Sequence, residues 1–156
     1  QAVLGLLAAR DETVAVAESI TGGGLGERLT GVAGSGDAFL GGVISYHLEV
    51  KKKLLGVDPA LLEDENVGPV SAPVAEQMAA GVRALLGSSW GVSLTGNAGP
   101  TADKGDKPVG LVYVAVAGPD GVTVEEHRFR GQREFIRRRS SQAALALLRR
   151  QVLAVP

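Results

Sequence analysis

The sequence has no cysteine, only two histidines and few aromatic residues, and each shortage excludes a kind of protein chemistry. Without cysteine there is no disulfide framework, no thiol nucleophile and no thiolate-bound metal. His47 and His127 are too few and too far apart in sequence for a histidine metal centre, so we expect no metal. No window approaches the roughly 18 apolar residues of a membrane span, and the N-terminal residues lack a signal-peptide pattern. We therefore expect a cytoplasmic protein with no membrane partner.

The net charge of -1 conceals an uneven distribution of arginine. Residues 128–150 contain eight arginines and one acid, Glu134, so this stretch is +7 and the rest of the chain is -8. A nucleic-acid binder would usually add aromatic side chains that stack on bases and a basic isoelectric point. This chain has one Trp, two Tyr and three Phe, with a pI of about 6.2. We expect the arginines to serve some purpose other than nucleic-acid binding.

Apolar runs alternate with segments of helical periodicity along the chain. The pattern predicts helices at 1–10, 21–30, 47–55, 71–87 and 132–153, a helical turn from Asp58, and strands at 13–18, 38–46, 90–95, 109–117 and 122–129. The run 38–46 lacks alternation and is predicted to be a buried strand. Gly118-Pro119-Asp120-Gly121 predicts a hairpin. Together these features predict one domain over residues 1–156: a three-layer α/β/α sandwich with a mixed, mostly parallel sheet containing one antiparallel hairpin.

The first chemical candidate is the segment from Glu18 to Gly24, where a predicted strand passes into a helix. A Ser19 hydroxyl at this point can face a substrate, and the glycines and helix N-terminus would offer backbone N–H groups to an anion. The structural alternative is that Ser19 or Thr21 caps the helix and the glycines form a turn. Taken alone, the segment favours this structural alternative.

Lys51 is the second candidate, in a lysine run that follows the strand ending near Tyr46. We interpret Lys52 and Lys53 as solvated surface residues. A free lysine has a pKa near 10.4, so about one side chain in 2,500 is neutral at pH 7. Action as a base requires a pKa about 3 lower, at a cost of about 4 kcal/mol, from burial or from nearby cations such as the arginines. Without cysteine, a Ser–Lys pair is the simplest hydrolase that this composition permits.

Two further segments contain candidate ligand-binding residues. The polar loop 96–107 opens with Thr95-Gly96-Asn97-Ala98-Gly99-Pro100, which is either a ligand-binding loop at a sheet edge or an ordinary connection. Arg133 and Arg137 share one face of the last predicted helix, which suits bidentate recognition of a phosphate. The alternative for these arginines is a solvated basic face.

These segments together resemble one family, the CinA C-terminal domain, whose members include nicotinamide mononucleotide (NMN) deamidases. The matching text, in chain order, is AES at 17–19, TGG at 21–23, FLGGV at 39–43, SY at 45–46, ExK at 49–51, VS at 70–71, TGxAGP at 95–100, KPVG at 107–110 and GxR at 131–133. The resemblance covers nearly the whole chain, and the joint occurrence of the pieces makes it specific.

The resemblance implies hydrolysis of the carboxamide of NMN to nicotinate mononucleotide and ammonia, without metal or cofactor. Ser19 would be the nucleophile and Lys51 the general base, with Tyr46 assisting by holding the Ser–Lys hydrogen bond in line. Backbone N–H groups at 21–23 are our choice of oxyanion donors. The expected substrate-binding residues are Thr21, Gly22, Gly23, Thr95, Gly96, Arg133 and Arg137.

The sequence leaves a second function open. A nucleotide-binding or regulatory module with the same fold and little or no turnover is favoured by glycines missing from the loop 99–104. Full-length relatives often carry an N-terminal domain that resembles molybdopterin-binding proteins. Because the chain starts at Gln1, we expect either a domain excised from such a protein or a stand-alone version. A homo-oligomer is compatible with the sequence.

Overall fold

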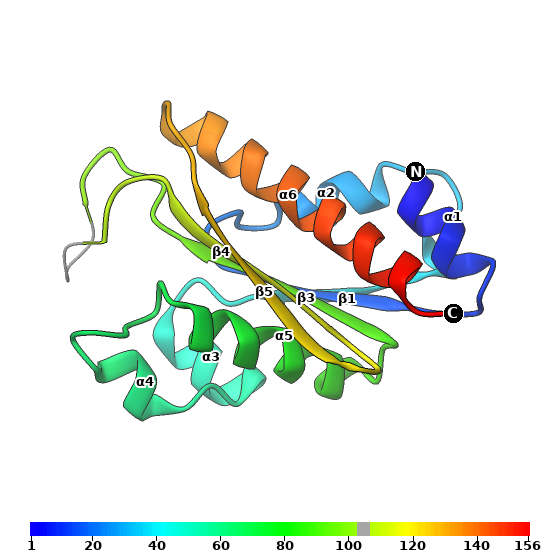
Figure 1. The fold of residues 1–156 in the computed structure, drawn as a ribbon, viewed down its shortest axis with the longest axis horizontal. Coiled ribbons are helices and arrows are strands. Elements are labelled where there is room, and N and C mark those ends of the chain that lie inside the picture. The colour runs from blue at the N-terminus through cyan, green and yellow to red at the C-terminus, as the bar shows by residue number, and fades with distance from the viewer. Residues whose placement is uncertain (103–106) are drawn as a thin grey trace.

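The computed structural model describes residues 1–102 and 107–156, and in them the chain forms a five-stranded mixed sheet (Figure 1). The strand order is β2-β1-β3-β4-β5. The strands are β1 (Val14–Glu18), β2 (Phe39–Ile44), β3 (Trp90–Gly96), β4 (Leu111–Gly118) and β5 (Gly121–Arg128). The predicted loop 96–107 includes residues 103–106, which lie outside the described part of the chain.

Helices cover both faces of the sheet. They are α1 (Ala2–Ala8), α2 (Gly24–Thr30), α3 (Leu48–Leu55), α4 (Pro59–Glu63), α5 (Ala72–Leu86) and α6 (Arg133–Ala154), with a 3-10 turn at Ser35–Asp37. Figure 1 shows α1, α2 and α6 on one face and α3, α4 and α5 on the other. The predicted three-layer α/β/α sandwich is therefore confirmed. Within the described ranges, no helix has the length and apolar character needed to cross a membrane.

The sheet is mixed in the way its strands pair. β1 pairs in parallel with β2 and β3, whereas β4 is antiparallel to both β3 and β5. The predicted hairpin between β4 and β5 is confirmed, with Gly118 opposite Gly121 at its turn. The sheet is mostly parallel in strand direction, because β4 alone runs against the others, but its pairings divide equally between parallel and antiparallel.

Strand β2 differs from the prediction of a buried strand. It forms an edge of the sheet, and its Leu40 and Ile44 are 47% and 57% exposed. The run lacks polar alternation partly because it contains Gly42, where a Cβ would collide with the backbone carbonyl of Val16 in β1. The apolar run of β2 therefore reflects close packing against β1, its one neighbouring strand, and not burial on both faces of the sheet.

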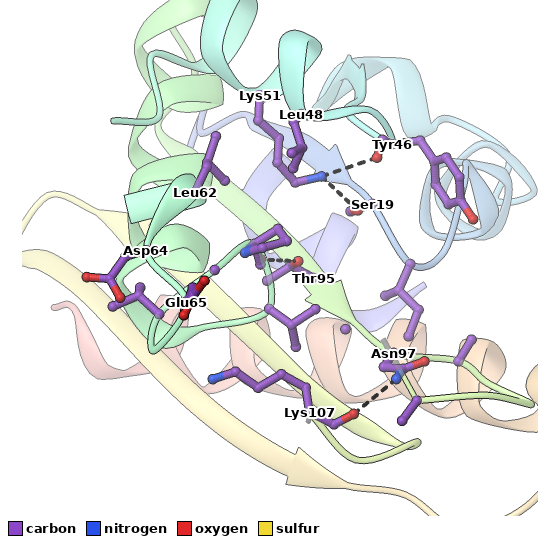
Figure 2. Close-up of a pocket in the computed structure, with 18 of the residues that line it drawn as sticks. Ser19, Tyr46, Leu48, Lys51, Leu62, Asp64, Glu65, Thr95, Asn97 and Lys107 are labelled. Carbon is purple, nitrogen blue, oxygen red and sulfur yellow. Dashed lines mark hydrogen bonds between the residues drawn. The ribbon is translucent and has the colours of Figure 1, made fainter. Parts of the chain in front are cut away.

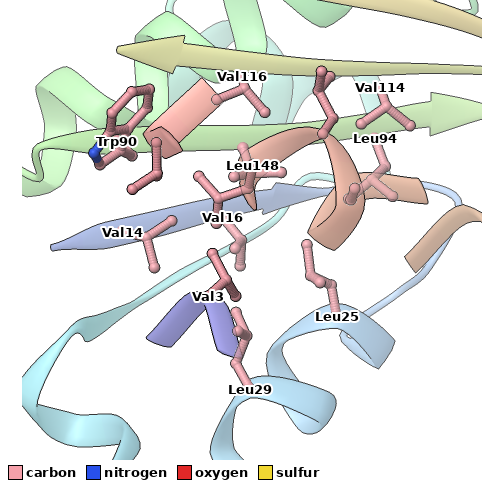
Figure 3. Close-up of a cluster of buried hydrophobic side chains, with 14 of the residues drawn as sticks. Val3, Val14, Val16, Leu25, Leu29, Trp90, Leu94, Val114, Val116 and Leu148 are labelled. Atoms are coloured by element: carbon pink, nitrogen blue, oxygen red, sulfur yellow. The ribbon is translucent and has the colours of Figure 1, made fainter. Parts of the chain in front are cut away.

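Strand β1 is an inner strand of the sheet and is buried on both faces. Val14 and Val16 belong to the core under α1, α2 and α6, which also contains Trp90 and Leu148 (Figure 3). The alternate residues of β1, Ala15 and Ala17, belong to the core under α3 and α5. This two-sided packing fixes the strand whose carboxyl end leads into Ser19.

The helix after β1 begins later than predicted. Gly22 and Gly23 adopt positive φ angles of 56° and 108°, which form a turn that glycine adopts without steric cost. Helix α2 therefore starts at Gly24 rather than at Thr21. The start of α4 agrees with the prediction, because the side chain of Asp58 accepts a hydrogen bond from the backbone N–H of Ala60.

Candidate active site

Three parallel strands end at the same edge of the sheet and bring the candidate segments together. Ser19 follows β1, Ser45 and Tyr46 follow β2, and Thr95 and Gly96 close β3. β1 lies between β2 and β3 in the sheet. The connection after β1 leads to β2 on one side of it, and the chain later crosses to β3 on its other side. Ligands of open α/β sheets bind at such a switch point, outside the carboxyl ends of the strands.

Ser19 and Lys51 form a buried hydrogen-bonded pair at this edge. The Nζ atom of Lys51 lies 2.9 Å from the Oγ atom of Ser19, and Figure 2 shows the two side chains pointing toward each other. Lys51 is only 1% exposed and Ser19 is 9% exposed. Helix α3 carries Lys51, so the pair joins residues 32 positions apart in the sequence. The structure brings together the two residues that the sequence nominated as nucleophile and base.

Burial lowers the pKa of Lys51 from 10.5 to about 8. The cause is loss of hydration of the ammonium group, not the neighbouring arginine charges that the sequence analysis also allowed. With a pKa of about 8, roughly one Lys51 side chain in ten is neutral at pH 7. The lowered value lies close to the pH range in which a general base is effective.

Two backbone carbonyls orient the Lys51 amine. Its Nζ donates to the carbonyl oxygen of Ser45 and lies 3.5 Å from that of Tyr46. A neutral amine has two N–H groups and one lone pair. When those two N–H groups face the two carbonyls, the lone pair is left to face the Ser19 hydroxyl. These carbonyls thus take the orienting role that a carboxylate has in a Ser-His-Asp triad.

A cavity of about 950 Å³ lies beside the pair. Its wall includes Ser19 and Lys51, the end of β3 with the loop that follows, and the segment 62–70, which runs from the last turn of α4 toward α5. Sequence reasoning missed the segment 62–70. Its acidic run at 63–65 was the available signal, but its place beside the cavity depends on a tertiary contact, in which the Thr95 hydroxyl donates to the Pro69 carbonyl at 2.7 Å.

The predicted role of the Tyr46 hydroxyl is not supported by its position. The side chain is 64% exposed, and its hydroxyl lies 3.5 Å from a guanidinium nitrogen of Arg133 rather than beside the Ser–Lys pair. Figure 2 shows the ring directed away from Lys51. Tyr46 approaches Lys51 through its backbone carbonyl instead. The expectation that the phenol holds the pair in line is therefore corrected.

Arg133 and Arg137 share a helix face as expected but have different surroundings. Arg133 lines the cavity, and its Nη1 donates to the Gly99 carbonyl at 2.7 Å. Arg137 is absent from the cavity wall and donates to the carbonyls of Ile20 and Thr21, at 3.1 and 2.9 Å. Of these two arginines, Arg133 alone lines the cavity, while Arg137 holds the residues 19–23, which we call the serine turn.

The residues 21–23 of the serine turn lie outside the cavity wall. Thr21, Gly22 and Gly23 do not line the cavity, and the Gly22 N–H donates to the Ser19 carbonyl at 3.2 Å. The N-terminus of α2 is occupied by the chain's own Glu18, whose carboxylate accepts hydrogen bonds from the first turn of the helix. The expected anion-binding role of the N-terminus of α2 is therefore corrected, whereas the oxyanion role of 21–23 stays a prediction.

Thr95 and Gly96 line the cavity as expected. Because the Thr95 hydroxyl donates to the Pro69 carbonyl, this side chain joins β3 to the segment 62–70. A Cβ at position 96 would lie 2.8 Å from the carbonyl oxygen of Leu111, so this position requires glycine where β3 meets β4. Asn97 continues the wall and accepts a hydrogen bond from the Gly99 N–H at 3.0 Å, which shapes the loop.

The fold and the site define an α/β/α protein with a buried Ser–Lys pair at the switch point of a mixed sheet. The model of the CinA C-terminal domain family matches residues 1–152. A CinA-like protein of Acaryochloris marina is 57% identical over 152 residues, which cover 96% of this chain and 36% of that relative. The chain belongs to the CinA C-terminal domain family.

Solved structures from this family have the same fold. The competence/damage inducible protein CihA from Agrobacterium tumefaciens has a TM-score of 0.89 and 34% identity, covering 94% of this chain and 89% of that one. The competence damage-inducible protein A (ComA) from Klebsiella pneumoniae has a TM-score of 0.93 and 26% identity, covering 99% and 98%. The curated relatives are longer, and the chain spans little more than a third of their length.

Proposed function

We propose that this chain is an amidohydrolase that converts NMN to nicotinate mononucleotide and ammonia. The observation that carries the proposal is the 2.9 Å hydrogen bond between Lys51 Nζ and Ser19 Oγ, buried at the wall of a 950 Å³ cavity. Membership of a family that includes NMN deamidases supports the choice of substrate. A serine becomes a nucleophile when an adjacent base takes its proton, and a lysine with a lowered pKa is such a base.

In the proposed first half-reaction, neutral Lys51 takes the hydroxyl proton of Ser19 while Oγ attacks the carboxamide carbon. The tetrahedral intermediate collapses when the Lys51 ammonium returns this proton to the amide nitrogen, the C–N bond breaks and ammonia leaves. The nicotinoyl group is then held on Ser19 as an ester. In the second half-reaction Lys51 activates a water molecule, which attacks the ester carbon and releases nicotinate mononucleotide with a regenerated Ser19 hydroxyl.

Arg133 is the residue that we propose for the phosphate of NMN. Its guanidinium lines the cavity from the first turn of α6, opposite in charge to a phosphate. Lys107 adds a second cationic side chain to the same cavity. The acidic side chains at 63–65 belong to a different stretch of the wall. This division of charge suits a ligand that carries both an anionic phosphate and a cationic pyridinium ring.

The direct experiment measures ammonia release from NMN by the wild type, Ser19→Ala and Lys51→Ala, with Lys53→Ala as the matched control. Lys53 is an exposed lysine on the same helix, so its replacement should leave the rate unchanged. We expect both site variants to lose at least about 10³-fold in kcat, as when other catalytic nucleophiles or bases are removed. A folded wild type that binds NMN without releasing ammonia would refute the enzyme and favour a nucleotide-binding module.

The phosphate assignment has a separate test. Arg133→Ala should raise the KM for NMN by about 10-fold or more, because a charge-assisted pair with phosphate is lost. Nicotinamide riboside has the same carboxamide but no phosphate, so its KM should change little. Equal losses for the two compounds would remove Arg133 from the phosphate site.

A further inference from the structure

The side chain of Glu18 is buried and bonded in a way that the proposed mechanism does not use. It is 2% exposed, and its carboxylate accepts three hydrogen bonds. The Thr21 hydroxyl and the Leu25 N–H donate to Oε1 at 2.6 and 2.7 Å, and the Gly26 N–H donates to Oε2 at 2.9 Å. The carboxylate therefore spans the serine turn, from the end of β1 to the first turn of α2.

The backbone of Glu18 is fixed independently of its side chain. Glu18 lies in the inner strand β1, paired with Ile44 of β2 and Leu94 of β3. Its carbonyl oxygen accepts the Ser45 N–H at 2.8 Å, and the carbonyl of Ser45 in turn accepts a hydrogen bond from Lys51. One residue is thus connected to both members of the pair, through its side chain to the turn that carries Ser19 and through its main chain to the segment that holds Lys51.

We propose that Glu18 is a positioning residue that sets the distance between Ser19 Oγ and Lys51 Nζ. The proposal rests on the proposed function for its kinetic consequence. A free serine turn, which contains Gly22 and Gly23 and is followed directly by Gly24 at the start of α2, would have many backbone conformations. The carboxylate reduces them by fixing the turn at Thr21 and again at the start of α2. Because proton transfer requires the two atoms to stay within hydrogen-bond reach, a small displacement of Ser19 would lower the rate strongly.

The test replaces Glu18 with glutamine, with Glu27→Gln as the matched control. Glutamine has the same shape as glutamate but only one acceptor oxygen. Its NH₂ group would take the place of one carboxylate oxygen and would face a group that donated a hydrogen bond to that oxygen. Glu27 is an exposed glutamate on α2, and its replacement should leave activity unchanged. We expect Glu18→Gln to lower kcat for NMN by about 10- to 100-fold. The KM should stay within about 2-fold, because Glu18 does not line the cavity.

A folded Glu18→Gln protein with unchanged kcat, or with a loss confined to KM, would overturn the proposal. If this variant does not fold, Thr21→Val removes a single hydrogen bond and should lower kcat by a few-fold, and an unchanged kcat would overturn the proposal equally.

A crystal structure of the variant separates this proposal from the proposed function. If the wild type releases no ammonia, the deamidase assignment fails, but the geometry can still be measured. Positioning by Glu18 predicts that the Ser19 Oγ to Lys51 Nζ distance exceeds 3.5 Å in Glu18→Gln, beyond hydrogen-bond reach. A distance that stays at 2.9 Å in that structure would overturn the proposal whatever the activity.

Discussion

Replacing Lys51 with methionine should change how the stability of the protein depends on pH. In the folded protein the pKa of Lys51 is about 8, whereas in the unfolded chain it returns to 10.5. Between these pH values the unfolded chain binds more protons at this residue, so the wild-type free energy of unfolding rises with pH there. Below pH 8 both states are protonated, and the full cost of burying the ammonium opposes folding. Lys51→Met has no such group and should lack this dependence.

The size of the effect follows from the difference between the two pKa values. A lowering from 10.5 to about 8 corresponds to about 3 kcal/mol at 1.36 kcal/mol per pKa unit. Between pH 7 and pH 9.5, the linkage relation relieves about 2 kcal/mol of this cost. The change in packing that Lys51→Met also causes does not depend on pH in this range, so it cancels when the difference between the two proteins is compared at the two pH values. The hydrogen bonds of Lys51 depend on its charge and are already included in its lowered pKa.

The assay is urea unfolding of both proteins at pH 7 and pH 9.5. Trp90 is the only tryptophan and lies in the core, so its fluorescence reports unfolding. We expect the stability of the wild type relative to Lys51→Met to increase by about 2 kcal/mol, or about 4–8 °C in relative Tm for a domain of this size. A relative stability that stays constant, or that falls with pH, would refute the conclusion that burial lowers this pKa.

Other consequences concern the rate, the serine turn and the packing of α5. The kcat/KM for NMN should rise with pH and level off above about 8, because neutral Lys51 is the proposed base; a flat profile from pH 6 to pH 9 would contradict that role. Arg137→Lys should lower kcat more than it changes KM, because a lysine cannot donate to two backbone carbonyls of the serine turn with the planar geometry of a guanidinium. Unchanged kinetics would contradict the role of Arg137 in holding the serine turn. In urea titrations Gly81→Ala should lower the free energy of unfolding by about 1–3 kcal/mol, because its Cβ would collide with the Leu55 carbonyl. The control Gly5→Ala, with open space around it, should stabilise by up to about 1 kcal/mol, and equal effects of the two would refute the packing argument.

The Glu18 and Arg137 contacts bear on how the proposed nucleophile, Ser19, is held. The N-terminus of α2 would attract an anionic ligand if it were free, but the Glu18 carboxylate already occupies it. The phosphate of the proposed substrate would therefore have to be bound elsewhere. The proposed phosphate contact falls on Arg133 because this residue lines the cavity, although its Nη1 also donates to the Gly99 carbonyl. Arg137, one helical turn later, does not line the cavity and donates to carbonyls of the serine turn.

Local sequence patterns predicted most of the secondary structure because the signals are local. The helical spacing after Ser71 and the turn residues 118–121 depend on neighbours a few positions away, and α5 and the β4–β5 hairpin form as expected. The same approach failed for the burial of β2. An apolar run looks alike in a central and an edge strand, and only the order of strands in the sheet places β2 at the edge.

The sequence by itself determined which groups are available for chemistry: a serine after a strand, a lysine after the next strand, and no cysteine. Only the tertiary structure decided their properties, because these depend on contacts between residues far apart in the chain. The pairing of β1 with β2 and the packing of α3 bury Lys51 and lower its pKa. The approach of α6 separates Arg133 in the cavity from Arg137 on the serine turn. Burial and hydrogen-bond partners arise from the packing of whole elements, which periodicity along the chain does not encode.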